Sequence, residues 1–162
     1  MTIQVRTDRG MSIERLIKEG HFCDDEEGCF LQTMSFISTI GRERPASLDL
    51  EMHLLDNKRG TPRDAMAYMR RNNMRPANVW DLLSLHRKHL RLVQSFPMIA
   101  FGSPAKRFTS ERGEESVYPY IAKGVPWGTN SPNPDIAFFL FGSFEKGWSK
   151  EAMILAVTNV FE

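Results

Sequence analysis

The chain contains little cysteine and no long apolar run, and each shortage excludes a class of protein. Only Cys23 and Cys29 occur among its 162 residues, which excludes a disulfide framework and favours a reducing compartment. No apolar run approaches the ~18 residues that a membrane span requires. The opening stretch, MTIQVRTDRG, has no apolar signal-peptide core. We therefore expect a cytoplasmic protein with no membrane partner.

The sequence also lacks the glycine-rich motifs that bind nucleotides, because neither G-x-x-x-x-G-K-(Ser/Thr) nor G-x-G-x-x-G occurs. Two related segments remain, FGSPAK at 101–106 and FGSFEK at 141–146. Their Ser-x-x-Lys spacing occurs in serine acyl-transferases, but the K-T-G and S-D-N partners are missing. We interpret both segments as apolar strand ends followed by helix starts, with Gly at the turn and Ser as the cap. Phosphate binding by the turn is the alternative, and one short match does not establish a duplication.

What is present is the composition of an ordinary globular protein, with 41% hydrophobic and 25% charged residues. The length predicts a single globular domain over 1–162. The net charge is +1, so composition alone makes no case for nucleic-acid binding. The charge is unevenly spread, because residues 42–91 hold eleven Lys/Arg against six Asp/Glu, whereas residues 14–27 are acidic.

Periodicity and capping signals predict an α+β fold with a helical N-terminal half. A short strand over 2–7 precedes helices at 12–20 and, less clearly, 29–40. Thr61-Pro62 and Asn78, each with an acid three residues on, begin two further helices that form a hairpin over about 62–94. The C-terminal half supplies a small mixed or antiparallel sheet from strands at 98–101, 116–122 and 135–141. A C-terminal helix over 148–160 completes the prediction.

The stretch SLDLEMHLL at 47–55 alternates between apolar and polar residues, which is typical of a half-buried strand. A helix starting after Pro45 is the competing interpretation. As a strand, it places Asp49, Glu51 and His53 on one face, where they can hold a divalent metal or act as acid and base. If these groups meet a Gly-Ser turn at 102–103 or 142–143, the protein is a phosphate-handling or metal-assisted hydrolase.

The helix pair carries most of the basic segment. Arg63 and Arg70 are seven residues apart and share a helical face, whereas the cations of the second helix come late in it. A helix-turn-helix would present residues 76–80, PANVW, to base edges, and these offer little hydrogen bonding. We therefore predict contact with the phosphates of a nucleic acid, or with an acidic protein surface. The contacting cations are Arg63, Arg70, Arg71, Arg75, Arg87, Lys88 and Arg91.

Three further features give weaker evidence of function. HFCDDEEGC at 21–29 offers three possible ligands, His21, Cys23 and Cys29, but their spacing is not that of a zinc site, so we predict no metal and no cofactor. His86 falls on the apolar stripe of the second helix and fits a core role. Trp127, on the loop GVPWGTNSPNP, is a candidate interface anchor and would make the protein an interaction or inhibitor module. Catalytic residues are not identifiable, and enzymatic activity stays an open question.

Overall fold

The computed structural model describes residues 2–6, 11–20, 22, 36, 49–55, 60–89, 91, 96–123, 137–148 and 152–159. The helices of this part are α1 (Ile13–Glu19), α3 (Pro62–Arg71) and α4 (Val79–Lys88). The strands are β1 (Thr2–Arg6), β2 (Asp49–Leu55), β3 (Arg75–Pro76), β4 (Met98–Ile99), β5 (Ala105–Thr109), β6 (Gly113–Lys123), β7 (Ala137–Gly142) and β8 (Met153–Asn159). Each helix begins at its predicted cap, where the side chain of Ser12, Thr61 or Asn78 accepts a backbone N–H three residues on.

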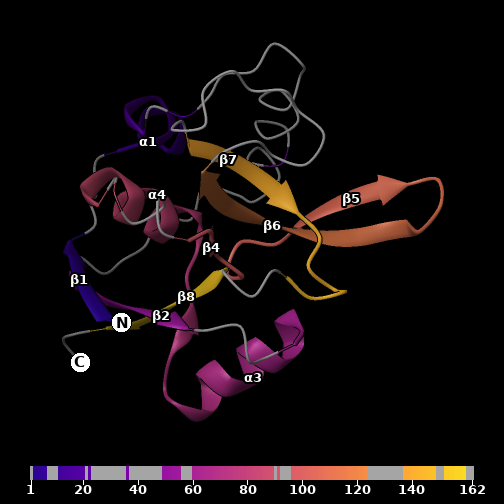
Figure 1. The fold of residues 1–162 in the computed structure, drawn as a ribbon, viewed down its shortest axis with the longest axis horizontal. Coiled ribbons are helices and arrows are strands. Elements are labelled where there is room, and N and C mark those ends of the chain that lie inside the picture. Colours follow the sequence, from indigo (N-terminus) through magenta and orange to yellow (C-terminus); the bar gives the residue numbers. More distant parts are fainter. Residues whose placement is uncertain are drawn as a thin grey trace.

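The strands form one eight-stranded mixed sheet in the order β1-β2-β8-β4-β6-β5, with β3 beside β8 and β7 beside β6 (Figure 1). Strand β8 is central. It runs antiparallel to β2 on one side, and on the other it is parallel to β4 and antiparallel to β3. The predicted helical N-terminal half is therefore wrong, because β1, β2 and β3 all come from it and two of them flank β8.

The sheet buries side chains on both faces. In β8, Leu155 and Val157 pack into one core cluster with residues of α1 and α4. Their neighbours Ile154 and Ala156 pack into a second cluster with Ala65 of α3. Because successive side chains of a strand point to opposite faces, α4 and α3 cover opposite faces of the sheet. Figure 1 shows them well apart.

The predicted helix hairpin is also wrong, although both of its helices exist. Between them Arg75 and Pro76 form β3, which pairs with Val157 and Ala156 of β8. The chain therefore crosses the sheet between α3 and α4, and the two helices cannot pack as a hairpin. The second helix also ends earlier than expected, at Lys88 with His89 as its C-cap.

The C-terminal helix predicted over 148–160 is wrong, because residues 153–159 form strand β8. Its residues 154–157 are all buried, and they face both layers of the core. A strand buried on both faces shows a continuous apolar run rather than alternation, so its periodicity does not distinguish it from a helix. Neighbouring strands on both sides then decide its conformation.

Other predictions are confirmed. Residues 49–55 form a strand, β2, which pairs with β1 on one side and β8 on the other. Both FGS segments lie at strand ends, as predicted: the first follows β4, and the second includes the last two residues of β7. The first is followed by β5 rather than a helix, and the second by a turn in which Gly147 N–H donates to the Phe144 carbonyl oxygen. The predicted helix at 29–40, apart from Phe36, and the loop at 124–134 lie outside the described residues.

Candidate functional site

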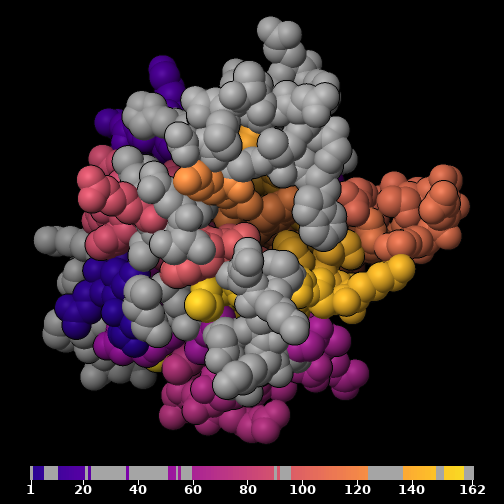
Figure 2. Space-filling model, in the orientation of Figure 1, coloured from indigo at the N-terminus to yellow at the C-terminus, as the bar shows by residue number. Residues whose placement is uncertain are grey.

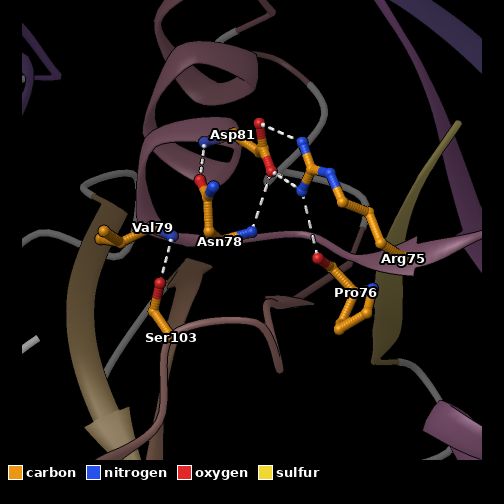
Figure 3. Close-up of polar contacts among 6 residues, drawn as sticks. All are labelled: Arg75, Pro76, Asn78, Val79, Asp81 and Ser103. Carbon is orange, nitrogen blue, oxygen red and sulfur yellow. Dashed lines mark hydrogen bonds and ion pairs between the residues drawn. The ribbon is translucent and has the colours of Figure 1, made fainter. Parts of the chain in front are cut away.

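Protein groups already occupy the N-terminus of α4 (Figure 3). Asn78 and Asp81 form a reciprocal capping box, with each backbone N–H donating to the other side chain at 2.9 Å. The Val79 N–H donates to the Ser103 hydroxyl oxygen, also at 2.9 Å. An anion at a helix N-terminus needs free N–H donors, and these three already have acceptors.

Gly102, the residue before Ser103, packs against the same end of α4. Its N–H donates to the Ala77 carbonyl oxygen at 2.7 Å. A Cβ at position 102 would lie 2.6 Å from that oxygen and 2.7 Å from the Pro76 carbonyl oxygen. Glycine is therefore needed here for close backbone packing. The first FGS segment is a packing turn against α4, and this geometry does not favour a phosphate site there.

Arg75 is held by a buried carboxylate. Its Nη1 lies 2.6 Å from Oδ2 of Asp81, and it also donates to the Pro76 carbonyl oxygen at 3.2 Å. Asp81 is fully buried, and the hydrogen bonds from Arg75 and from the Asn78 N–H stabilise its carboxylate there. Arg75 therefore has a structural partner and joins β3 to α4.

The cations at the end of α4 lie near α1. Arg87 Nε is 2.8 Å from Oε2 of Glu19, while Oε1 of the same carboxylate contacts Arg15 at 3.0 Å. Lys88 is exposed, and so is Arg91 in the turn beyond the helix. Glu19, from the acidic segment at 14–27, thus neutralises Arg87, from the basic segment at 42–91.

The cations of α3 are in a different situation. Arg63, Arg70 and Arg71 are all exposed, and within the described residues none of them forms an ion pair. The acid of this helix, Asp64, accepts a hydrogen bond from the Thr61 hydroxyl at 2.8 Å and is engaged at the cap. Three guanidinium groups therefore face solvent without a carboxylate partner.

The seven predicted contact residues consequently do not form one surface. Those of α3 lie on one side of the sheet, and those of α4 follow a helix packed on the other. The helix-hairpin prediction required one phosphate backbone to contact both helices. Because α3 and α4 lie on opposite faces of the sheet, their cations do not face one groove. The exposed side of α3 is the largest set of unpaired cations among the described residues that share one element.

The polar face of β2 does form, and His53 is its centre. His53 Nε2 lies 3.2 Å from Glu51 Oε1 and 3.1 Å from Thr158 Oγ1, and Nδ1 lies 3.3 Å from Thr2 Oγ1. Strand pairing explains this grouping, because β2 lies between β1 and β8. Asp49 begins the strand opposite Arg6. The imidazole is thus fixed by hydrogen bonds across three strands.

The Gly-Ser turns do not meet this group. Met52 packs into the α4 cluster, so Glu51 and His53 face the other side of the sheet, whereas Ser103 contacts α4 itself. The turn at 142–143 follows β7, and β8, β4 and β6 separate β7 from β2. At about 4.8 Å per strand, this is about 19 Å. The geometry does not support the pocket that the hydrolase hypothesis requires.

The other candidate ligands do not assemble either. Within the described residues, no group of three or more His, Cys, Asp and Glu side chains is arranged to hold a metal. His86 is buried, bonds through Nε2 to the Gly20 carbonyl oxygen at 3.0 Å and stacks on Phe22, as a core residue does. His21, Cys23, Cys29 and Trp127 lie outside the described residues.

Sequence reasoning missed one exposed side chain. Phe108 on β5 is 81% exposed, because the segment after Ser103 is a strand rather than the expected helix start. The signal available was the alternation in AKRFT, where Lys106 and Phe108 share one face.

Comparison of the chain with protein-family models, with curated proteins and with solved structures gives no match. Of the helices in the described part, none has the length and apolar character needed to cross a membrane. A functional proposal therefore depends on the surfaces of the molecule itself.

Proposed function

We propose that this protein is a non-catalytic binding protein that contacts the phosphate backbone of a nucleic acid through the exposed face of α3. The observation that carries the proposal is that Arg63, Arg70 and Arg71 are exposed and form no ion pair among the residues that the structure describes. Arginine donates to phosphate oxygens through two parallel N–H groups, and it keeps its charge at all physiological pH values. Elsewhere, Arg75 and Arg87 contact carboxylates of the chain itself.

The spacing on α3 suits a repeating anion. Arg63 and Arg70 lie on one helical face and are separated along the helix axis by about 10 Å, at ~1.5 Å per residue. Three base-pair steps of about 3.4 Å span the same distance. Asn72, the C-cap, already donates its side-chain amide to the Tyr68 carbonyl oxygen. With few base-reading groups beside the arginines, binding that depends weakly on sequence is expected.

The cellular setting follows from composition. Two cysteines in 162 residues favour a reducing compartment, so we place this binding in the cytoplasm. An acidic protein surface is the second candidate partner, since clustered carboxylates also accept from arginine. The two partners differ in chemistry, which allows a competition experiment to separate them.

The test is fluorescence anisotropy of labelled single-stranded and duplex oligonucleotides at about 50 and 200 mM salt. Three phosphate contacts predict a loss of affinity between these conditions of about 40-fold for the duplex and about 20-fold for the single strand. The double variant Arg63→Ala/Arg70→Ala should lower the slope of log affinity against log salt by about two. The matched control Lys88→Ala/Arg91→Ala removes the same charge from the α4 side and should leave the slope near that of the parent.

Two results would overturn the proposal. One is the absence of binding at the lower salt concentration, and the other is an equal loss of affinity in both double variants. If polyglutamate competes as well as the unlabelled oligonucleotide, the partner is an acidic protein surface rather than a nucleic acid.

A further inference from the structure

The hairpin formed by β5 and the first half of β6 has no part in the function proposed for α3. The two strands pair from Ala105–Val117 to Thr109–Gly113, and Gly113 has a φ of 68°, which suits the left-handed position at the turn. Figures 1 and 2 show this hairpin standing out from the body of the molecule. Glu115 and Val117 on one of its faces are buried, so the hairpin presents its other face and one strand edge.

One face of the hairpin is apolar at its centre. Lys106, Phe108 and Glu114 share this face, and all three are exposed. Among the described residues, Phe108 is the large hydrophobic side chain left open to solvent. The outer edge of β5 also has no partner strand in the described part of the chain, since β5 pairs only with β6. Such an edge can accept a further strand.

The charges and exposed side chains of the hairpin indicate which strand pairs with the edge of β5. Lys106, Arg107 and Arg112 are balanced by Glu111, Glu114 and Glu115, so the hairpin is neutral overall. A partner of one charge sign gains no net attraction here. Lys106 and Phe108 are two residues apart on the exposed face, so a two-fold axis at Arg107 brings the cation of each copy to the ring of the other, and the edge is complementary to itself.

We infer that a second copy of this chain docks on the hairpin, with the two β5 strands pairing antiparallel about a two-fold axis at Arg107. In this register Lys106 lies opposite Phe108 of the second copy, so an ammonium group meets an aromatic ring on each side of the axis. The two Arg107 side chains face each other. Each is already neutralised by Glu115 of its own chain, with Nη2–Oε1 at 2.5 Å and Nε–Oε1 at 2.7 Å.

Sedimentation equilibrium of the full chain over a concentration series tests this inference, which is independent of the proposal for α3. The expected mass is twice 18.6 kDa, and the variant Phe108→Glu should return it to 18.6 kDa. Phe108 is exposed, so this change should not affect folding. The control Arg70→Glu, on α3, should keep the doubled mass. A parent chain that sediments as one copy at every concentration overturns the inference, and so does a dimer that Phe108→Glu leaves intact.

A cysteine scan tests the register in a Cys23→Ser/Cys29→Ser background. Arg107→Cys should give a covalent dimer on oxidation, because paired strands bring the two Cα atoms within about 5.5 Å, inside disulfide range. Lys106→Cys should crosslink poorly, since it faces Phe108 of the second copy. Efficient crosslinking at 106 and none at 107 contradicts the pairing. A monomer whose oligonucleotide affinity falls on Phe108→Glu would assign the hairpin to nucleic acid instead.

Discussion

Helices α3 and α4 have equal lengths and similar N-terminal caps, yet α4 is mostly buried and α3 is mostly exposed. Each has ten residues, a polar N-cap and an acid three residues later. In α4, eight of the ten residues are buried, whereas α3 buries only Pro62, Ala65 and Met69. Similar local signals therefore produced one core helix, whose capping acid and Arg87 have partners in the fold, and one surface helix whose arginines form no ion pair within the described residues.

The largest expected difference between the two helices concerns their capping acids. Asp81→Ala removes the buried acceptor of Arg75 and of the Asn78 N–H, and should cost about 2–4 kcal/mol of unfolding free energy, since Arg75 itself stays partly solvated. Asp64→Ala, at the exposed cap of α3, should cost about 1 kcal/mol or less. Urea unfolding midpoints measure both. Equal losses would show that the α4 cap is no more structural than the α3 cap.

The two FGS segments sharpen the same contrast. Gly102→Ala forces a Cβ against two backbone carbonyl oxygens beside α4 and should cost about 1–3 kcal/mol. Gly142→Ala meets two side-chain rings, Tyr120 at 3.1 Å and Phe144 at 3.4 Å, which can shift, so its cost should be smaller. Thermal unfolding of the two variants decides the point. If Gly142→Ala were the more damaging, close packing at the start of α4 would not explain Gly102.

The smallest expected effects separate binding from stability. Arg70→Ala should lower the salt slope of oligonucleotide binding by about one and change stability by less than about 0.5 kcal/mol. Arg87→Ala removes a partly exposed ion pair with Glu19, which is worth about 0–1 kcal/mol, and should leave the salt slope unchanged. Anisotropy titrations and urea curves on both variants give the comparison. The opposite pattern would move the binding surface to α4.

Local chemistry made some elements predictable. Ser12, Thr61 and Asn78 cap their helices because a side-chain oxygen and a nearby N–H need no distant partner. The alternation in 49–55 identified β2 and the shared face of Glu51 and His53. In the same way, one face of α3 was predicted to carry Arg63 and Arg70.

Other features depended on distant residues. Arg75 and Pro76 look like a turn, but they pair with β8, which comes some eighty residues later in the chain. The segment of β8 itself reads as a helix until β2 and β4 bond to its two edges. Which cations acquire partners was likewise unpredictable, because Glu19 meets Arg87 only after α1 packs beside α4.

The sequence by itself therefore determined where α1, α3 and α4 begin, which residues alternate along β2 and which segments are charged, since these follow from contacts a few residues apart. Tertiary structure alone decided that α3 and α4 lie on opposite faces of the sheet. It also decided that Arg75 and Arg87 have carboxylate partners, whereas Arg63, Arg70 and Arg71 have none in the part of the chain that the structure describes. The physical reason is that burial and ion pairing depend on which distant segments the sheet brings together.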